Sequence, residues 1–438
     1  MPGHEKNRMI EWPRCAWRWL SPDDWKRSVS RAAVVMLMVV LAGFAFITLG
    51  LTPIAADKGH WHITRNFLKY TMTRSVSMQS RGTQVPALDD PSLVLKGAGH
   101  YATDCMPCHS APGQTRALVV EQMVPAPPVL ADVVDDWNSR ELFWIVKHGI
   151  KYTAMPAWST QRRDDEVWAM VAFLQQLPRM EAPHYRELAL GPLAAATAGA
   201  EGARISTMEL PPLSARDNCA RCHGADGEGR GDGAIPRLAG QREAYLLASL
   251  QAYARGERHS GIMQPVAAGL HDVQMAELAR HYASLPPAAA SVASSAGVDA
   301  RPTEPSMAVD ASEADNSILT LPHASPTPAL PDSPSPEHAR ARGAALALHG
   351  SRHQRIPACR HCHGPGANDR NPDYPRLAGQ HPGYLALQLR LFQQDRRGGT
   401  VYRQLMQDIA SRLSEQQIMD LAAYYGERES AGGKPDSE

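Results

Sequence analysis

Three short motifs in this chain could do chemistry, because each has two cysteines separated by two residues and followed at once by a histidine. They are Cys105/Cys108/His109, Cys219/Cys222/His223 and Cys359/Cys362/His363. Two thiols at this spacing can add across the two vinyl groups of a haem, and the adjacent histidine can ligate its iron. The motifs therefore predict three covalently attached haem c groups, with the six cysteines as attachment points and the three histidines as metal ligands.

Two other uses of a CxxC pair have to be weighed against haem attachment. A structural zinc site normally needs four ligands, and each motif lacks a second pair nearby. A thioredoxin-like redox pair would sit in a βαβ pattern, which the chain does not show. Three copies within one repeat favour haem attachment over both.

A methionine follows each motif at a fixed place in the sequence. The chain divides into three blocks with one motif each, residues 88–181, 203–286 and 339–428. Met155, Met263 and Met406 each lie twelve residues before an apolar residue of the helix predicted at the end of their block. A thioether on the sixth iron position stabilises ferrous iron and leaves no open site for oxygen or peroxide. We therefore expect these methionines as metal ligands and no catalytic residue; the alternative is that each methionine fills the core beside the haem.

One structural unit accounts for the three blocks. After each CxxCH comes a Pro-x-Leu, and each block ends in a stretch with apolar residues at helical spacing, which predicts amphipathic helices. The Pro-x-Leu pairs are Pro128/Leu130, Pro236/Leu238 and Pro375/Leu377, and the apolar helix positions are Val167/Val171/Leu174, Met275/Ala279/Tyr282 and Ile418/Ala422/Tyr425. The predicted fold is mainly α, with three domains in tandem.

Composition and charge narrow the class of protein. The 438 residues carry 45 Lys plus Arg against 45 Asp plus Glu, so no basic excess supports binding to nucleic acid. Residues 32–51 lack charged side chains and would span about 30 Å as a helix, the thickness of a bilayer core. The basic leader predicts a transmembrane helix through the lipid bilayer with a cytoplasmic N-terminus; a cleaved signal peptide is the alternative.

The remaining segments follow from shifts in composition. Residues 61–82 favour an interfacial helix, with a simple spacer as the alternative. The predicted order is a cytoplasmic leader (1–31), a transmembrane helix (32–51), a juxtamembrane segment (57–87), domain 1 (88–181), a linker (183–202), domain 2 (203–286), a disordered Pro/Ala/Ser linker (287–338) and domain 3 (339–428). Domain 3 has thirteen Lys or Arg against seven acids, and we expect it to be a mobile shuttle head with exposed arginines such as Arg396 and Arg397.

Each block resembles a class I cytochrome c domain. Blocks two and three together resemble the tandem domains of bacterial dihaem cytochromes, through the repeated Pro-Arg-Leu-Ala-Gly-Gln at 236–241 and 375–380. The resemblance implies that the Pro128, Pro236 and Pro375 carbonyls accept the Nδ1 proton of the ligating histidine. Arg237 and Arg376 could pair with a haem propionate or be solvated. The departure from that family is the long linker between the two blocks, which argues against a fixed haem-to-haem geometry.

These patterns predict a membrane-anchored trihaem cytochrome c, an electron-transfer protein rather than an enzyme. We expect its domains on the periplasmic side of a bacterial inner membrane, passing electrons to a terminal oxidase. The alternative is the cytochrome c subunit that accepts electrons from a periplasmic alcohol, aldehyde or sugar-acid dehydrogenase. A haem peroxidase would need an open sixth position, and the three methionines argue against it.

Overall fold

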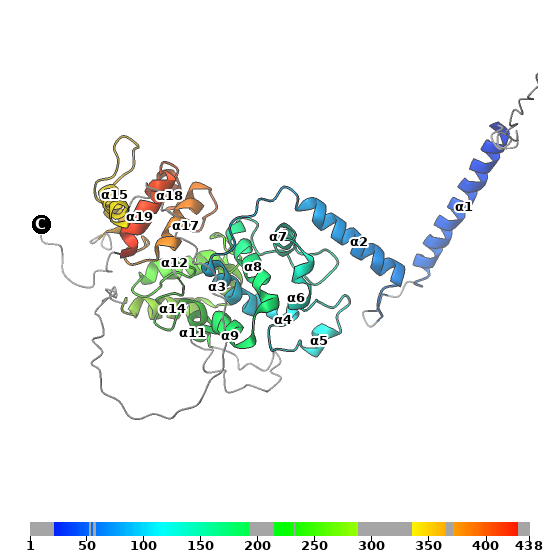
Figure 1. Cartoon of the computed structure of the whole chain (residues 1–438), viewed down its shortest axis with the longest axis horizontal. Helices are drawn as coiled ribbons and strands as arrows, with labels where there is room; N and C mark the ends of the chain where they lie inside the picture. The colour runs from blue at the N-terminus through cyan, green and yellow to red at the C-terminus, as the bar shows by residue number, and fades with distance from the viewer. Residues whose placement is uncertain are drawn as a thin grey trace, which may run out of the picture. The chain divides into compact units, whose positions relative to one another are not determined.

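The structure is a computed structural model that describes residues 22–51, 54–55, 58–191, 214–231, 233–287, 335–364 and 371–427. Regular structure in these ranges is helical, and the only β contacts there are two isolated bridges, Arg230 with Ile235 and Ser351 with Ile356 (Figure 1). The predicted mainly α class is confirmed. The predicted leader up to residue 21 and most of the predicted Pro/Ala/Ser linker lie outside the described residues.

The first 64 residues form one compact unit and the rest of the chain forms another. In the first unit, α1 runs over Pro22–Thr48, and its segment Trp25–Thr48 is long and apolar enough to cross a membrane. The helix starts ten residues before the predicted span, because no Pro or Gly interrupts the turns between residues 23 and 42. It ends before Gly50, whose φ of 68° is the left-handed conformation that glycine adopts readily. The juxtamembrane helix α2 covers His62–Gln79, within the predicted 61–82.

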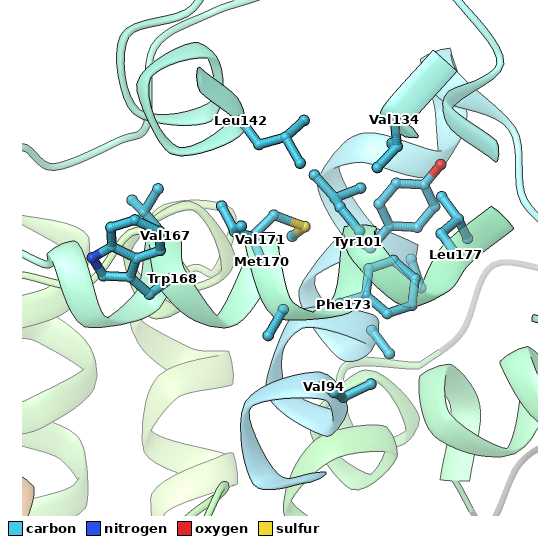
Figure 2. Packing of buried hydrophobic residues seen from close by; sticks show 14 of the residues in the cluster. Val94, Tyr101, Val134, Leu142, Val167, Trp168, Met170, Val171, Phe173 and Leu177 are labelled. Atoms are coloured by element: carbon cyan, nitrogen blue, oxygen red, sulfur yellow. The ribbon is translucent and has the colours of Figure 1, made fainter. Parts of the chain in front are cut away.

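Domain 1 is built on two long helices that cross closely, α3 and α8. Gly97 in α3 permits this approach, since a Cβ there would stand 2.4 Å from the Ala169 carbonyl oxygen. Tyr101 and Phe173 pack nearby, with ring centroids 5.0 Å apart (Figure 2). The elements are α3 (Pro91–His100), the π-helix η2 (Tyr101–Cys105), α4 (Met106–His109), α5 (Leu118–Glu121), α6 (Leu130–Val133), η3 (Val134–Asp136), α7 (Ser139–His148), α8 (Asp164–Gln176), η4 (Leu177–Arg179) and α9 (Ala182–Leu190).

The predicted linker 183–202 is wrong over its first half. Residues 183–190 belong to α9, where Tyr185 and Ala189 are buried in the core of domain 1. Gly191-Pro192 and the Ala/Gly-rich run after it suggested a linker, but Tyr185 and Ala189 before them are four residues apart and lie on one helix face. The stretch from 192 to 213 lies outside the described residues.

Domains 2 and 3 each surround a smaller core. Domain 2 contains α11 (Ala215–His223), α12 (Glu243–Ala254), α13 (Met263–Ala268) and α14 (Asp272–Ser284). Domain 3 contains α15 (Pro336–His349), α16 (Arg360–His363), α17 (Pro382–Gln393), α18 (Arg403–Ala410) and α19 (Glu415–Glu427). The predicted final helices are therefore α8, α14 and α19, and their predicted apolar positions are all buried.

The glycine crossing of domain 1 recurs in domain 3. A Cβ on Gly343 of α15 would stand 2.0 Å from the Asp420 carbonyl oxygen in α19. Ser414 and Gln417 start α19 with reciprocal bonds: the Ser414 N–H donates to the Gln417 side chain at 2.9 Å, and the Gln417 N–H donates to Ser414 Oγ at 3.2 Å. In domain 1 the glycine lets α3 pack closely on α8, and in domain 3 it lets α15 pack closely on α19.

Candidate haem-binding sites

Each CxxCH motif occupies a helical turn, so its first cysteine, second cysteine and histidine at i, i+3 and i+4 share one face. The motif starting at Cys105 runs from η2 into α4, the motif starting at Cys219 ends α11, and the motif starting at Cys359 enters α16. None of these six cysteines forms a disulfide. The local fold therefore presents two free thiols and an imidazole together in every copy.

The three motif histidines make the same hydrogen bond. Nδ1 of His109 lies 2.9 Å from the Pro128 carbonyl oxygen, Nδ1 of His223 lies 3.0 Å from that of Pro236, and Nδ1 of His363 lies 2.9 Å from that of Pro375. Because the carbonyl can only accept, the proton is on Nδ1 and Nε2 is free to ligate a metal. The role expected for the three prolines is confirmed.

Burial shifts the pKa of the motif residues toward their neutral forms. Burial lowers the pKa of His109, His223 and His363, against the opposing effect of the proline bond, so the imidazoles are neutral. Burial also raises the pKa of Cys105 to about 12. Zinc and redox sites need thiolates, whose pKa is normally lowered. In the described ranges no group of three or more His, Cys, Asp or Glu is placed to hold a metal ion.

A continuous cavity of about 570 Å³ joins the motif regions of domains 2 and 3. His223 and Met263 line its domain 2 part, and His363 and Met406 line its domain 3 part. Apolar side chains complete each wall, among them Leu246, Leu278 and Tyr282 in domain 2. The structure therefore brings the predicted histidine and methionine of these two domains to one cavity, as a six-coordinate iron would require.

Buried cations in the wall of this cavity provide a test of whether haem fits. Arg258 is 4% exposed and donates to Ser249 Oγ at 2.8 Å and to the Tyr384 and Tyr245 hydroxyls at 3.1 and 3.4 Å, but to no carboxylate of the described residues. Arg397 donates to the Tyr245 hydroxyl at 3.0 Å, while its buried Nε has no partner. Burying unpaired cations is costly unless an anion joins them. A haem brings two carboxylates, so these residues fit the group.

Domain 1 differs from the other two. His109 lines a separate cavity of about 410 Å³ together with Tyr101 and Leu177. Met155 lies in the turn after α7, where its carbonyl oxygen accepts a hydrogen bond from the Ile150 N–H at 3.3 Å. Met155 is not among the described residues that line the His109 cavity. Ligation by Met155 stays a prediction from its spacing.

The motif cysteines of domain 1 also depart from the expectation that both would face one haem cavity with their histidine. All four motif cysteines of domains 2 and 3 line the large cavity, but neither Cys105 nor Cys108 is among the residues that line the His109 cavity. Residues 110–116, the loop after the motif, form much of the wall of that cavity. Cys105 instead packs against the apolar core, and Cys108 is half-buried in the single turn of α4. Haem attachment at Cys105 and Cys108 therefore stays a prediction from the motif.

Domains 2 and 3 dock through their repeated Pro-Arg-Leu-Ala-Gly-Gln segments. The Gln241 side chain accepts from the Arg376 N–H at 2.8 Å and donates to the Arg376 carbonyl at 3.0 Å. The Gln380 side chain makes the same two bonds with Arg237, at 3.0 and 2.9 Å. Each glutamine thus pairs with the backbone of the other domain as a neighbouring strand would, and the contact has approximate two-fold symmetry.

Across this contact the Arg237 and Arg376 guanidiniums donate to the Gly379 and Gly240 carbonyls. Arg237 is half-buried, Arg376 is exposed, and both line the large cavity, so pairing with a haem propionate stays a prediction. The structure corrects two other expectations from the sequence. Arg397 is buried rather than exposed, and Arg396 lies 3.7 Å from Asp164 of domain 1. Domain 3 is therefore a docked domain in the structure, not a separate shuttle head.

Sequence analysis missed the residues that join the domains. Gln241 and Gln380 were visible as part of a repeat, but a repeat alone does not reveal that its two copies touch each other. Arg258 lies in a polar run that also contains Arg255, so only its burial distinguishes it. Glu166 looked like one of three acids at the start of a helix, and only the fold shows that it is 3% exposed.

The described fold and motifs define a c-type cytochrome with more than one cytochrome c domain. Residues 92–174 match the family model described as "Cytochrome C oxidase, cbb3-type, subunit III", and residues 200–285 match the model described as "Cytochrome c".

The chain is also similar in sequence to individual cytochromes of known name. It is 32% identical to the "Thiosulfate dehydrogenase electron acceptor" of Thiomonas intermedia (strain K12), over 53% of this chain and 88% of that protein. It is 28% identical to "Cytochrome c4" of Pseudomonas aeruginosa, over 47% of this chain and 81% of that protein. A solved cytochrome c4 of Acidithiobacillus ferrooxidans has 29% identity, covers 49% of this chain and 99% of that chain, and has a TM-score of 0.33.

The chain belongs to the family of c-type cytochromes that includes these electron acceptors and cytochromes c4. Cytochrome c domains hold haem c covalently, and the relatives are electron-transfer proteins. The chain is therefore a multi-haem electron-transfer protein rather than an enzyme. Its residues hold the cofactor, exclude water from it and set its ligands; the iron itself supplies reversible one-electron chemistry.

Proposed function

We propose that the chain carries three covalent haem c groups and transfers electrons between redox proteins on the outer side of a bacterial inner membrane. The observation that carries the proposal is the repeated CxxCH site, in which each histidine donates its Nδ1 proton to a proline carbonyl. That bond leaves Nε2 of His109, His223 and His363 as the metal ligand in all three domains. The sixth ligands are Met155, Met263 and Met406.

The membrane attachment in this proposal is α1. Its apolar side chains are exposed along the whole helix, as lipid contact requires. α2 follows with Arg65, Lys69 and Arg74 among apolar residues, a composition that suits the headgroup region. An uncleaved α1 keeps the haem domains at the membrane surface, where respiratory enzymes are found.

Electrons enter, in this proposal, from a periplasmic dehydrogenase and leave toward a terminal oxidase. The entry side is supported by relatives named as electron acceptors of thiosulfate dehydrogenase, in Thiomonas intermedia and in Stutzerimonas stutzeri. This favours an inorganic sulfur compound as the substrate of the partner enzyme over an alcohol, aldehyde or sugar acid. The choice of a terminal oxidase as the electron acceptor is based on the predicted membrane anchor.

The haem count can be tested on the purified full-length holoprotein. The pyridine haemochrome assay should give three haems per chain, and Cys362→Ala should remove close to one of them. A count of two in the wild type would restrict the proposal to domains 2 and 3.

The direction of transfer can be tested in native membranes. The ascorbate-reduced protein is exposed to oxygen, and haem absorbance is followed with and without an inhibitor of the terminal oxidase. Fast, inhibitor-sensitive oxidation supports the oxidase as acceptor. Slow oxidation that ignores the inhibitor, while oxidase activity is intact, contradicts it and leaves the dehydrogenase-subunit function.

The donor can be tested separately. The oxidised protein is mixed with a purified thiosulfate dehydrogenase and thiosulfate, and reduction of its haems is followed. Rapid reduction that requires both components supports the proposed entry. Reduction only by an organic-substrate dehydrogenase would overturn it.

A further inference from the structure

A buried carboxylate of domain 1 binds the loop of domain 2 that precedes Met263. Glu166, in the first turn of α8, is 3% exposed. Its Oε1 accepts a hydrogen bond from Ser260 Oγ at 2.7 Å, and its Oε2 accepts one from the Gly261 N–H at 2.6 Å. A carboxylate acceptor makes hydrogen bonds of the stronger, charge-assisted kind, so this contact ties the loop firmly to domain 1.

The contact continues to Met263 itself. Ser260 Oγ, which donates to Glu166, accepts from the Met263 N–H at 3.0 Å and from the Ile262 N–H at 3.3 Å. N–H groups at the start of a helix have no acceptor within the helix, and the N-cap residue of α13, Ile262, makes no side-chain cap. Ser260 therefore supplies the acceptor. The position of the Met263 backbone thus depends on a serine whose hydroxyl is oriented by Glu166.

Further contacts from domain 1 hold the same loop. Arg163 bonds Glu166 at 3.0 Å and donates through Nη1 to the His259 carbonyl at 2.9 Å. The Trp158 ring packs on Gly261 so closely that a Cβ there would stand 1.9 Å from the indole nitrogen. The loop is therefore bound by charge, hydrogen bonds and packing, all from the neighbouring domain.

Domain 3 provides an internal comparison, because among the described residues no side chain of domain 1 donates to or accepts from residues 401–406. Val401 and Leu405 are 89% and 46% exposed, while Tyr402 and Arg403 are half-buried. The Met406 N–H donates only to the Tyr402 carbonyl, at 3.3 Å. The support of Met263 is thus a property of domain 1 docking and not of the repeat.

We propose that Glu166 is a positioning residue that acts across the domain boundary, so that domain 1 stabilises methionine ligation in domain 2. The inference rests on the proposed function, in which Met263 ligates the domain 2 haem. It assigns to domain 1 a second role, besides carrying its own haem, as a support for the ligand set of its neighbour.

Glu166→Gln tests this inference in the full-length holoprotein. The two donors face different oxygens of Glu166, and an amide keeps only one of these oxygens as an acceptor, so the loop should be held less tightly. Imidazole displaces methionine from ferric haem, and the readouts are imidazole titration by absorbance and the paramagnetically shifted methyl signals of ligating methionines. We expect imidazole to bind one haem roughly tenfold more tightly, the size of effect that the loss of one charge-assisted bond produces. The other haems should be unchanged.

The control is Glu141→Gln, which removes another glutamate bond within domain 1, the Glu141 Oε2 contact with the Asn138 N–H at 3.1 Å, without touching domain 2. Ser260→Ala should reproduce the Glu166→Gln effect through the second link of the chain. Met263→Leu identifies the methyl signal of domain 2. If it removes no methyl signal, the ligand assignment fails; if it does, and neither Glu166→Gln nor Ser260→Ala changes imidazole binding, the positioning role is overturned.

Discussion

The loops before Met263 and Met406 occupy the same place in two copies of one repeat, and their surroundings differ. The domain 2 loop is enclosed: Ser260 is 3% exposed and Arg258 4%. The domain 3 loop is only partly covered: Tyr402 and Arg403 are half-buried, but Val401 is among the most exposed apolar residues described. Both methionines line the same cavity. The repeat therefore provides the same chemistry twice, while the neighbouring domain decides how firmly the methionine is held and how accessible its loop is to a partner.

The largest effect is expected from a variant that prevents domain 3 from folding, because the loop before Met406 would then be lost. Gly343→Leu would place a Cβ 2.0 Å from the Asp420 carbonyl oxygen, and a backbone atom in the facing helix cannot move aside as a side-chain tip could. We expect a loss of about 3 kcal/mol or more in the unfolding free energy of domain 3. Thermal unfolding followed through the haem absorbance should show an early transition.

Gly269→Ala in domain 2 is the matched control, because the nearest atom to its Cβ would be 3.6 Å away. A Gly343→Leu protein that melts with the control would contradict the tight crossing of α15 and α19.

Gly261→Ala should make the enclosed loop resemble the partly covered one. Its Cβ would meet the buried Trp158 ring at 1.9 Å, so domain 1 would have to shift. We expect the contact between domains 1 and 2 to weaken by about 2 kcal/mol. Hydrogen exchange should then be faster at amides 259–263 and unchanged at 401–405.

The double variant Gly261→Ala/Trp158→Phe should restore part of the protection, since the smaller ring leaves room for the methyl group. No difference between the single and double variants would mean that Trp158 is not what the new methyl group meets.

Gln380→Ala should loosen domain 3 from domain 2 without unfolding either. The change removes the two bonds that Gln380 makes with Arg237, and leaves that backbone N–H and carbonyl without protein partners. We expect a loss of about 1–2 kcal/mol in the docking free energy. Limited proteolysis near residues 236–241 reports it.

Gln393→Ala serves as the control, because Gln393 donates to the Leu413 carbonyl within domain 3 at 2.8 Å. Equal proteolysis of the two variants near 236–241 would argue against a specific docking role for Gln380.

The smallest expected effect is a difference in acid stability. Burial alone would raise the pKa of Asp420, but hydrogen bonds from Arg342 and Gln416 outweigh it and lower the pKa. A lowered carboxyl pKa stabilises the folded state above the unfolded value of about 3.9, and this stabilisation is lost as pH falls through the folded pKa. Glu277, at the corresponding place in domain 2, is exposed.

Domain 3 should therefore lose stability relative to domain 2 below about pH 4. Asp420→Asn should flatten this acid dependence, as measured by unfolding at a series of pH values. An unchanged acid limb would show that Asp420 is not responsible.

Several features followed from the sequence because they depend on short-range spacing. CxxCH and the apolar positions of each final helix lie within one or a few helical turns, whereas the role of the three prolines came from the resemblance to class I cytochrome c domains. The spacing of Met263 and Met406 also predicted that each would share a cavity with its histidine. The same reasoning misassigned residues 183–190 as linker, because the core that buries Tyr185 is formed by helices distant in sequence.

What the sequence by itself determined is therefore the residue set of each repeat: two thiols, an adjacent imidazole and a methionine at a fixed spacing. Only the tertiary structure decided how the repeats meet. Gln241 with Arg376, Gln380 with Arg237 and Glu166 with Ser260 are contacts between residues 94 to 143 positions apart. Such pairs have no periodicity to reveal them, since they form only when folded surfaces bury polar groups that must then be satisfied by the neighbouring domain.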